Sequence, residues 1–161
     1  MCGVDLTQID GIDALTAQVI LTEIGWDMSP WPTAKHFASW LRLSPCNDIS
    51  GGKVLRRRTK KTANRANTAL RVAAQSLARS NSALGAFYRR IRARHGPAKA
   101  VVATAHKLAR IIYAMLKYRR PYVDPGARYY EERYQERVIR NLERKAARFG
   151  LVLTPAVAEV S

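Results

Sequence analysis

The chain has 161 residues, with 28 Lys and Arg against 12 Asp and Glu, which gives a formal net charge of +16. This length suits one domain with a real core, and an apolar content of 47% excludes a disordered basic tail. Two cysteines are too few for a disulfide framework or a zinc site, and neither a signal peptide nor a membrane-spanning run is visible, so we expect a cytoplasmic protein without membrane contact.

Apolar residues recur at helical spacing along nearly the whole chain, so the predicted fold class is all-α. Capping residues, glycines and prolines place the helices at about 15–24, 34–43, 62–79, 84–95, 97–117 and 124–148. The only strand candidate is 151–153. The side chains expected to be buried are Leu70, Leu77, Phe87, Ile91, Leu108 and Ile112, together with Trp26, Trp31 and Trp40.

Charge divides the chain into three parts of what we expect to be one compact domain. Residues 1–48 are mildly acidic and begin like a helix-hairpin-helix unit. Residues 49–123 carry nineteen Lys and Arg and no Asp or Glu, and form the predicted basic core. Residues 124–161 form a C-terminal helix and tail of mixed charge, whose tyrosines 129, 130 and 134 pack either on their own domain or on another protomer. A purely basic block repels itself unless a polyanion lies against it, so nucleic acid is the expected partner.

The first candidate motif is the turn at 9–13, which precedes a helix. Gly11 lets backbone N–H groups approach a phosphate at the positive end of that helix. Asp13 would cap the helix but would repel a phosphate. A plain helix-capping turn therefore stands as the alternative to a phosphate site.

The second motif is Ser50-Gly51-Gly52-Lys53. A serine can attack a phosphodiester when its hydroxyl is deprotonated and the developing charge is stabilised. Here Gly51 and Gly52 would admit a phosphate backbone, and the following cations would hold the neighbouring phosphates. An ordinary flexible turn is the alternative. The cations concerned are Lys53, Arg56, Arg57, Arg58, Lys60 and Lys61.

Two later helices carry further candidates for nucleic-acid contact. The helix from 62 to 79 holds Asn64, Arg65 and Arg71, whose side chains suit phosphates or base edges. The helix from 97 places Lys99, His106, Arg110 and Lys117 on one stripe, which either follows a nucleic-acid backbone or is a solvated face. The histidines show no metal-ligand spacing, so no metal site is expected in this chain.

The order of these motifs carries a family resemblance. Six segments, in this order, resemble the C-terminal half of the DEDD-type, bridge-RNA-guided insertion-sequence transposases of the IS110 and IS116 type. They are the hairpin-like start, the segment at 41–45, Ser50–Lys53 and the runs at 64–71, 83–90 and 103–110. The likeness covers roughly residues 7–120. Asp13 and Ala63 stand where the family pattern commonly has glycine.

The resemblance implies a function in DNA transposition and recombination, with Ser50 as the nucleophile that forms a covalent link to cleaved DNA. It also implies a noncoding guide RNA, composite active sites shared by protomers of a homo-oligomer, and Mg²⁺ held by four carboxylates of an N-terminal RuvC-like domain. That domain is not visible in these residues, so we expect a truncated chain that is inactive alone. The alternatives are a noncatalytic nucleic-acid-binding helical module and a helical oligomerisation unit.

Overall fold

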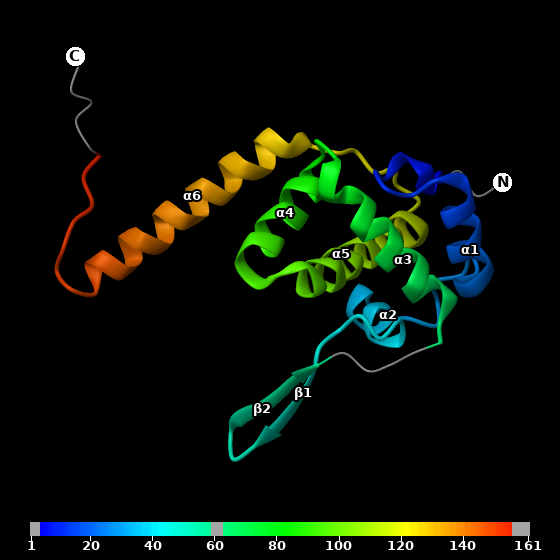
Figure 1. Cartoon of the computed structure of the whole chain (residues 1–161), viewed down its shortest axis with the longest axis horizontal. Coiled ribbons are helices and arrows are strands. Elements are labelled where there is room, and N and C mark those ends of the chain that lie inside the picture. Colours follow the sequence, from blue (N-terminus) through cyan, green and yellow to red (C-terminus); the bar gives the residue numbers. More distant parts are fainter. Residues whose placement is uncertain (1–3, 59–62, 156–161) are drawn as a thin grey trace.

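A computed structural model describes residues 4–58 and 63–155, and for residues 46–49, 54 and 56–58 it describes the backbone only. The described chain is built mainly from helices, which confirms the all-α class (Figure 1). A compact body precedes one projecting helix. The elements are η1 (Leu6–Gln8), α1 (Ala14–Ile24), α2 (Ala34–Trp40), β1 (Cys46–Ser50), β2 (Lys53–Arg58), α3 (Arg65–Ser76), η2 (Leu77–Arg79), α4 (Ala83–His95), α5 (Pro97–Tyr118) and α6 (Gly126–Ala147).

Helix α5 is the centre of the body, because α2, α3 and α4 all pack against it. Its buried positions Ala100, Thr104, Leu108 and Ile112 repeat every four residues and form one continuous face. Helix α3 lies between this face and α1. Leu70, Leu77, Leu108 and Ile112 are buried as predicted, whereas Phe87 and Ile91 are only half-buried at the edge of the core.

Local capping sets the helix boundaries, which confirms the predicted helices to within a few residues. The Thr33 hydroxyl accepts from the His36 N–H, Asn64 Oδ1 accepts from the Asn67 N–H, and the Ser82 hydroxyl accepts from the Gly85 N–H. At the other ends, α1 and α4 stop at Gly25 and Gly96, whose positive φ angles suit glycine.

The expectation that residues 46–58 would hold no strand is wrong. β1 and β2 pair as an antiparallel hairpin, with Ser50 opposite Lys53. Gly51 and Gly52 form its two-residue loop with φ angles of +56° and +77°. Two successive positive φ angles are what a tight hairpin turn requires, and glycine adopts them without a steric penalty. Residues 151–153, the only strand candidate in the sequence, form no strand.

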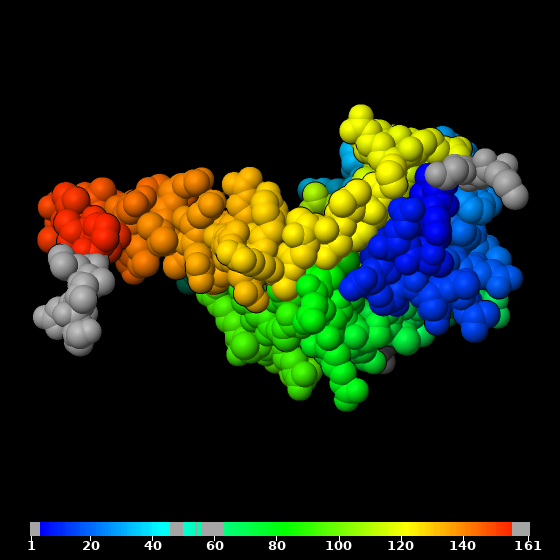
Figure 2. All heavy atoms as spheres, turned by 90° about the horizontal axis from the view of Figure 1, so that it is seen from above, coloured from blue at the N-terminus to red at the C-terminus, as the bar shows by residue number. Residues whose placement is uncertain are grey.

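Helix α6 leaves the body and has no buried residue. Figure 1 shows that its first turns lie beside α4 and that its remainder extends away from the other helices, and Figure 2 shows the same projection from above. Tyr130 packs edge-to-face on Phe87 with ring centroids 6.2 Å apart. Tyr130 therefore docks the helix on its own domain, the first of the two alternatives for these tyrosines.

The tryptophans are not all core residues. Trp31 is half-buried and packs on Phe37 and Trp40, with ring centroids 5.0 and 4.9 Å away. Trp40 itself is 41% exposed and Trp26 is 45% exposed, so the burial predicted for these two is wrong. Both follow or end a short helix, where a large ring can cover the core edge and still face solvent.

Candidate nucleic-acid interface

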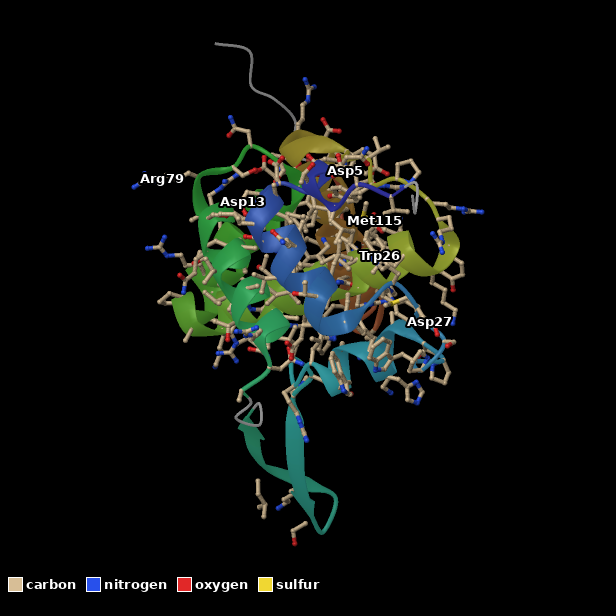
Figure 3. All side chains as sticks on the ribbon, turned by 90° about the vertical axis from the view of Figure 1, so that its right-hand side faces the viewer. Asp5, Asp13, Trp26, Asp27, Arg79 and Met115 are labelled. Atoms are coloured by element: carbon tan, nitrogen blue, oxygen red, sulfur yellow. The ribbon has the colours of Figure 1, made fainter. Side chains whose placement is uncertain are left out.

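Ser50 stands at the tip of the hairpin, which projects from the body (Figures 1 and 3). It is the last residue of β1 and is exposed. A Cβ atom added at Gly51 or Gly52 would meet nothing within 4 Å. These glycines are therefore required by the turn rather than by crowding among the described atoms.

Basic residues follow Ser50 directly along the hairpin. Lys53 is exposed and faces Ser50 across the turn. The backbone of Arg56–Arg58 continues β2 opposite residues 46–48, and an irregularity between Asp48 and Ile49 leaves Leu55 outside the register. Leu55 is 67% exposed. The candidates Lys60 and Lys61 lie outside the described residues.

The start of α3 supplies a second group of candidates. Asn64 is the N-cap, so its Oδ1 is committed to the Asn67 N–H at 3.0 Å. Arg65 is exposed at the first helical position, whereas Arg71 is half-buried along the same helix. The buried Asn67 amide, which the sequence did not single out, donates to the Leu41 carbonyl at 2.6 Å and ties α3 to the end of α2.

Gly11 lies against α3. A Cβ added there would lie 2.8 Å from the Ala73 carbonyl oxygen and 2.9 Å from Ser76 Oγ, so glycine permits the close approach of the two segments. Asp13 caps α1 by accepting from the Thr16 N–H at 2.7 Å. Hydrogen bonds from the Thr16 side chain and backbone hold the pKa of the Asp13 carboxyl below its usual value. Packing and capping thus account for this turn, and phosphate binding by Gly11 stays a prediction.

The stripe predicted on α5 divides into two kinds of residue. Lys99 and Arg110 are exposed. His106 is half-buried, and burial, with a smaller effect of the Arg110 charge, lowers the pKa of its imidazole. Lys117 donates to the Pro32 carbonyl at 2.8 Å and to the Tyr113 hydroxyl at 2.7 Å, so its ammonium joins α5 to the segment before α2.

A cluster of cations on aromatic rings joins α4, α5 and α6. The Arg90 guanidinium carbon lies 4.0 Å from the centroid of the Tyr134 ring and 4.8 Å from that of Tyr130. Lys107 Nζ lies 4.5 Å from the centroid of Phe87. Burial, followed by the charges of Arg90 and Arg137, lowers the pKa of Lys107. Aromatic residues next to arginines at 87–90, together with the three tyrosines at 129–134, are the signal that could have indicated this cluster.

Within residues 4–58 and 63–155, no three His, Cys, Asp or Glu side chains are placed to hold a metal ion. No helix of the described chain is both long and apolar enough to cross a membrane.

Comparison with known proteins places the chain in a family. Residues 5–89 match the model of the Transposase IS116/IS110/IS902 family. This segment runs from just before η1 into α4 and includes the whole hairpin. No curated protein and no solved structure matches the chain. Since the matched segment covers more than half of the sequence, the chain belongs to the IS116/IS110/IS902 family of transposases, which act in DNA transposition and recombination.

Proposed function

We propose that this chain binds DNA along the basic hairpin and the start of α3, and that Ser50 is the nucleophile of strand exchange. The observation that carries the proposal is the position of Ser50, exposed at the tip of a projecting hairpin and opposite Lys53. A hydroxyl in this position is accessible to a DNA duplex. The basic strand after it can hold the phosphates on either side.

The proposed step is a transesterification. Ser50 Oγ forms a bond to phosphorus while the bond from phosphorus to a deoxyribose oxygen breaks, and the departing oxygen takes up the proton. The reverse attack, by a deoxyribose hydroxyl of another strand, releases Ser50 and restores a phosphodiester. Because one ester replaces another, the bond energy is conserved and no external energy source is needed.

Further components of the reaction rest on the family resemblance. They are a guide RNA, a homo-oligomer with shared active sites, and an RuvC-like domain whose four carboxylates hold Mg²⁺. The metal, when bound there, supplies Lewis-acid stabilisation of charge on the reacting oxygens. In this chain, Lys53 and the arginines of β2 would stabilise the negative charge of the pentacovalent phosphorus.

A noncatalytic nucleic-acid-binding module is the second candidate. The observation that favours it is that the hairpin projects away from the helical body (Figure 3), so a residue that activates Ser50 would have to come from outside the described helices. Such a module would retain the basic hairpin for affinity while Ser50 had no role.

Covalent trapping separates the two candidates. The chain is incubated with DNA, Mg²⁺, the cognate RNA and a compatible RuvC-like half, and protein–DNA adducts are resolved on a denaturing gel. We expect an adduct that disappears in Ser50→Ala and persists in the matched control Ser44→Ala, while both variants bind DNA like the parent chain. An adduct that survives Ser50→Ala would exclude Ser50 as the nucleophile. DNA binding without any adduct would favour the noncatalytic module.

A further inference from the structure

Helix α1 is apolar on two sides, only one of which is covered. Ala17, Ile20 and Ile24 face the core and are buried. On the outward side, Leu15 is 73% exposed and Val19 is 39% exposed, and Trp26 extends this surface just beyond the helix. A shallow hollow beside them is lined by Ala14, Gln18, Leu21 and Trp26. Large apolar side chains that gather on an exposed face mark a candidate interface, so the outward side of α1, which also carries Gln18 and Glu23, is one.

The outer half of α6 carries a second exposed apolar stripe. Ile139, Leu142, Ala146 and Phe149 follow one another at spacings of three, four and three residues, which places them on one stripe. Ile139 is 54% exposed and Leu142 is 49% exposed. The stripe continues past the helix in residues 151–153, all of them exposed. A ridge of this kind is what lies in a shallow apolar groove.

The charges of the two surfaces are opposite. Residues 1–34 contain five Asp and Glu and no Lys or Arg. Asp13 caps α1, Glu23 lies on α1 itself, and Asp5 and Asp27 lie in the segments on either side of it; all four are exposed. Residues 137–148 contain Arg137, Arg140, Arg144, Lys145 and Arg148 against the single acid Glu143, a net charge of +4. Attraction between the two surfaces is therefore expected, and it orients one on the other.

The two surfaces of one molecule cannot meet. Helix α6 packs on α4, and its outer end extends away from the side of the body where α1 lies (Figures 1 and 2). Pairing between the outer halves of two α6 helices would bring together two segments of net charge +4, which is unfavourable. The occupant that satisfies both shape and charge is α1 of a second copy of this chain.

We propose that the outer half of α6 docks on the outward side of α1 of a second copy, through the stripe 139–149 and the surface around Leu15 and Val19. The contact joins two different surfaces, so it is heterologous, and repetition of it gives either a closed ring or an open chain of copies. Neither surface includes the hairpin or Ser50. Failure of this contact would therefore leave the proposed DNA-binding surface and the role of Ser50 untouched.

Complementation between two variants tests this arrangement with the full chain. Leu15→Lys disrupts the α1 surface, and Leu142→Glu disrupts the α6 surface. Because both positions are exposed, folding should be unchanged, which circular dichroism checks. Analytical ultracentrifugation should show self-association of the parent chain. Each variant alone should associate at least about tenfold more weakly, as expected when a central interface residue is replaced. An equimolar mixture should form a one-to-one dimer, because each partner retains one intact surface.

The control is Arg128→Ala, on the inner end of α6, where the arginine side chain is 93% exposed and pairs with Glu132 on its own helix. This variant should associate like the parent chain, and rising salt should weaken association of both. Association of Leu15→Lys alone as tight as that of the parent chain would indicate that α6 pairs with itself and would overturn the proposal. A parent chain that stays monomeric at all concentrations, or a mixture that stays monomeric, would overturn it as well.

Discussion

Gly85 allows α4 to pass directly over the chain that precedes it, so Gly85→Ala should destabilise the protein although alanine is the better helix former. An added Cβ would overlap the Ser80 carbonyl oxygen and would lie 2.9 Å from the Leu77 carbonyl oxygen. Both obstacles are backbone atoms, which no side-chain rotation can move. The Ser80 carbonyl is also held in place, since it accepts from Arg89 at 2.6 Å.

Two opposing effects set the magnitude. Replacing glycine by alanine inside a helix stabilises by about 1 kcal/mol. Overpacking costs about 1–3 kcal/mol, and its upper range applies where the backbone must shift. We therefore expect a net loss of about 1–2 kcal/mol in the free energy of unfolding. For a domain of this size, that corresponds to a fall in Tm of about 2–8 °C.

Urea unfolding followed by circular dichroism measures the effect. The matched control is the reverse exchange at an exposed position of the same helix, Ala93→Gly, which should cost up to about 1 kcal/mol through propensity alone. Opposite exchanges of one methyl group should thus both destabilise α4. If Gly85→Ala were as stable as the parent chain or more stable, the close packing of α4 on the segment 77–80 would be refuted.

Three further predictions concern the core, pH and nucleic-acid binding. Leu108→Ala should lower the free energy of unfolding by about 2–5 kcal/mol in urea titrations, because truncating a fully buried side chain leaves a cavity. Because folding lowers the pKa of His106, the unfolded state takes up the proton first as pH falls, and the free energy of unfolding should drop below about pH 6.5. His106→Gln should reduce this drop, which unfolding measured from about pH 7.5 to 5 would show. Removing the basic side chains after Ser50 should flatten the slope of log affinity for duplex DNA against log salt concentration by several units. Each phosphate that the protein no longer neutralises should contribute roughly 0.9 to this change. An unchanged slope would place the binding surface elsewhere. The five substitutions to Ala are at Arg56, Arg57, Arg58, Lys60 and Lys61.

The helices could be predicted because their ends depend on neighbouring residues. The caps at Thr33, Asn64 and Ser82 and the glycines at 25 and 96 act within one turn of the chain, so the sequence contains the whole signal. The family, and with it the function in transposition, could be predicted from the order of motifs.

The hairpin was missed because its strands do not show regular alternation, and the irregularity at Asp48 and Ile49 interrupts it further. The two consecutive glycines were nonetheless a signal for a two-residue hairpin loop.

The roles of individual basic residues could not be predicted from the sequence, because they depend on contacts between distant segments. Lys117 donates to the carbonyl of Pro32, and Arg89 donates to the carbonyls of Ala78 and Ser80. In a block without acidic residues, such cations cannot be distinguished by sequence from those that face a nucleic acid. The exposed cations Lys53, Arg65, Lys99 and Arg110 remain the candidates for phosphate contact.

Peptide mapping of the trapped protein–DNA adduct tests the central claim, that Ser50 is the nucleophile, most directly. After nuclease treatment, trypsin should release the segment from Leu43 to Lys53, which contains only two serines, Ser44 and Ser50. We expect fragmentation in the mass spectrometer to locate the nucleotide on Ser50. A nucleotide on Ser44, or on any other residue, would contradict the account.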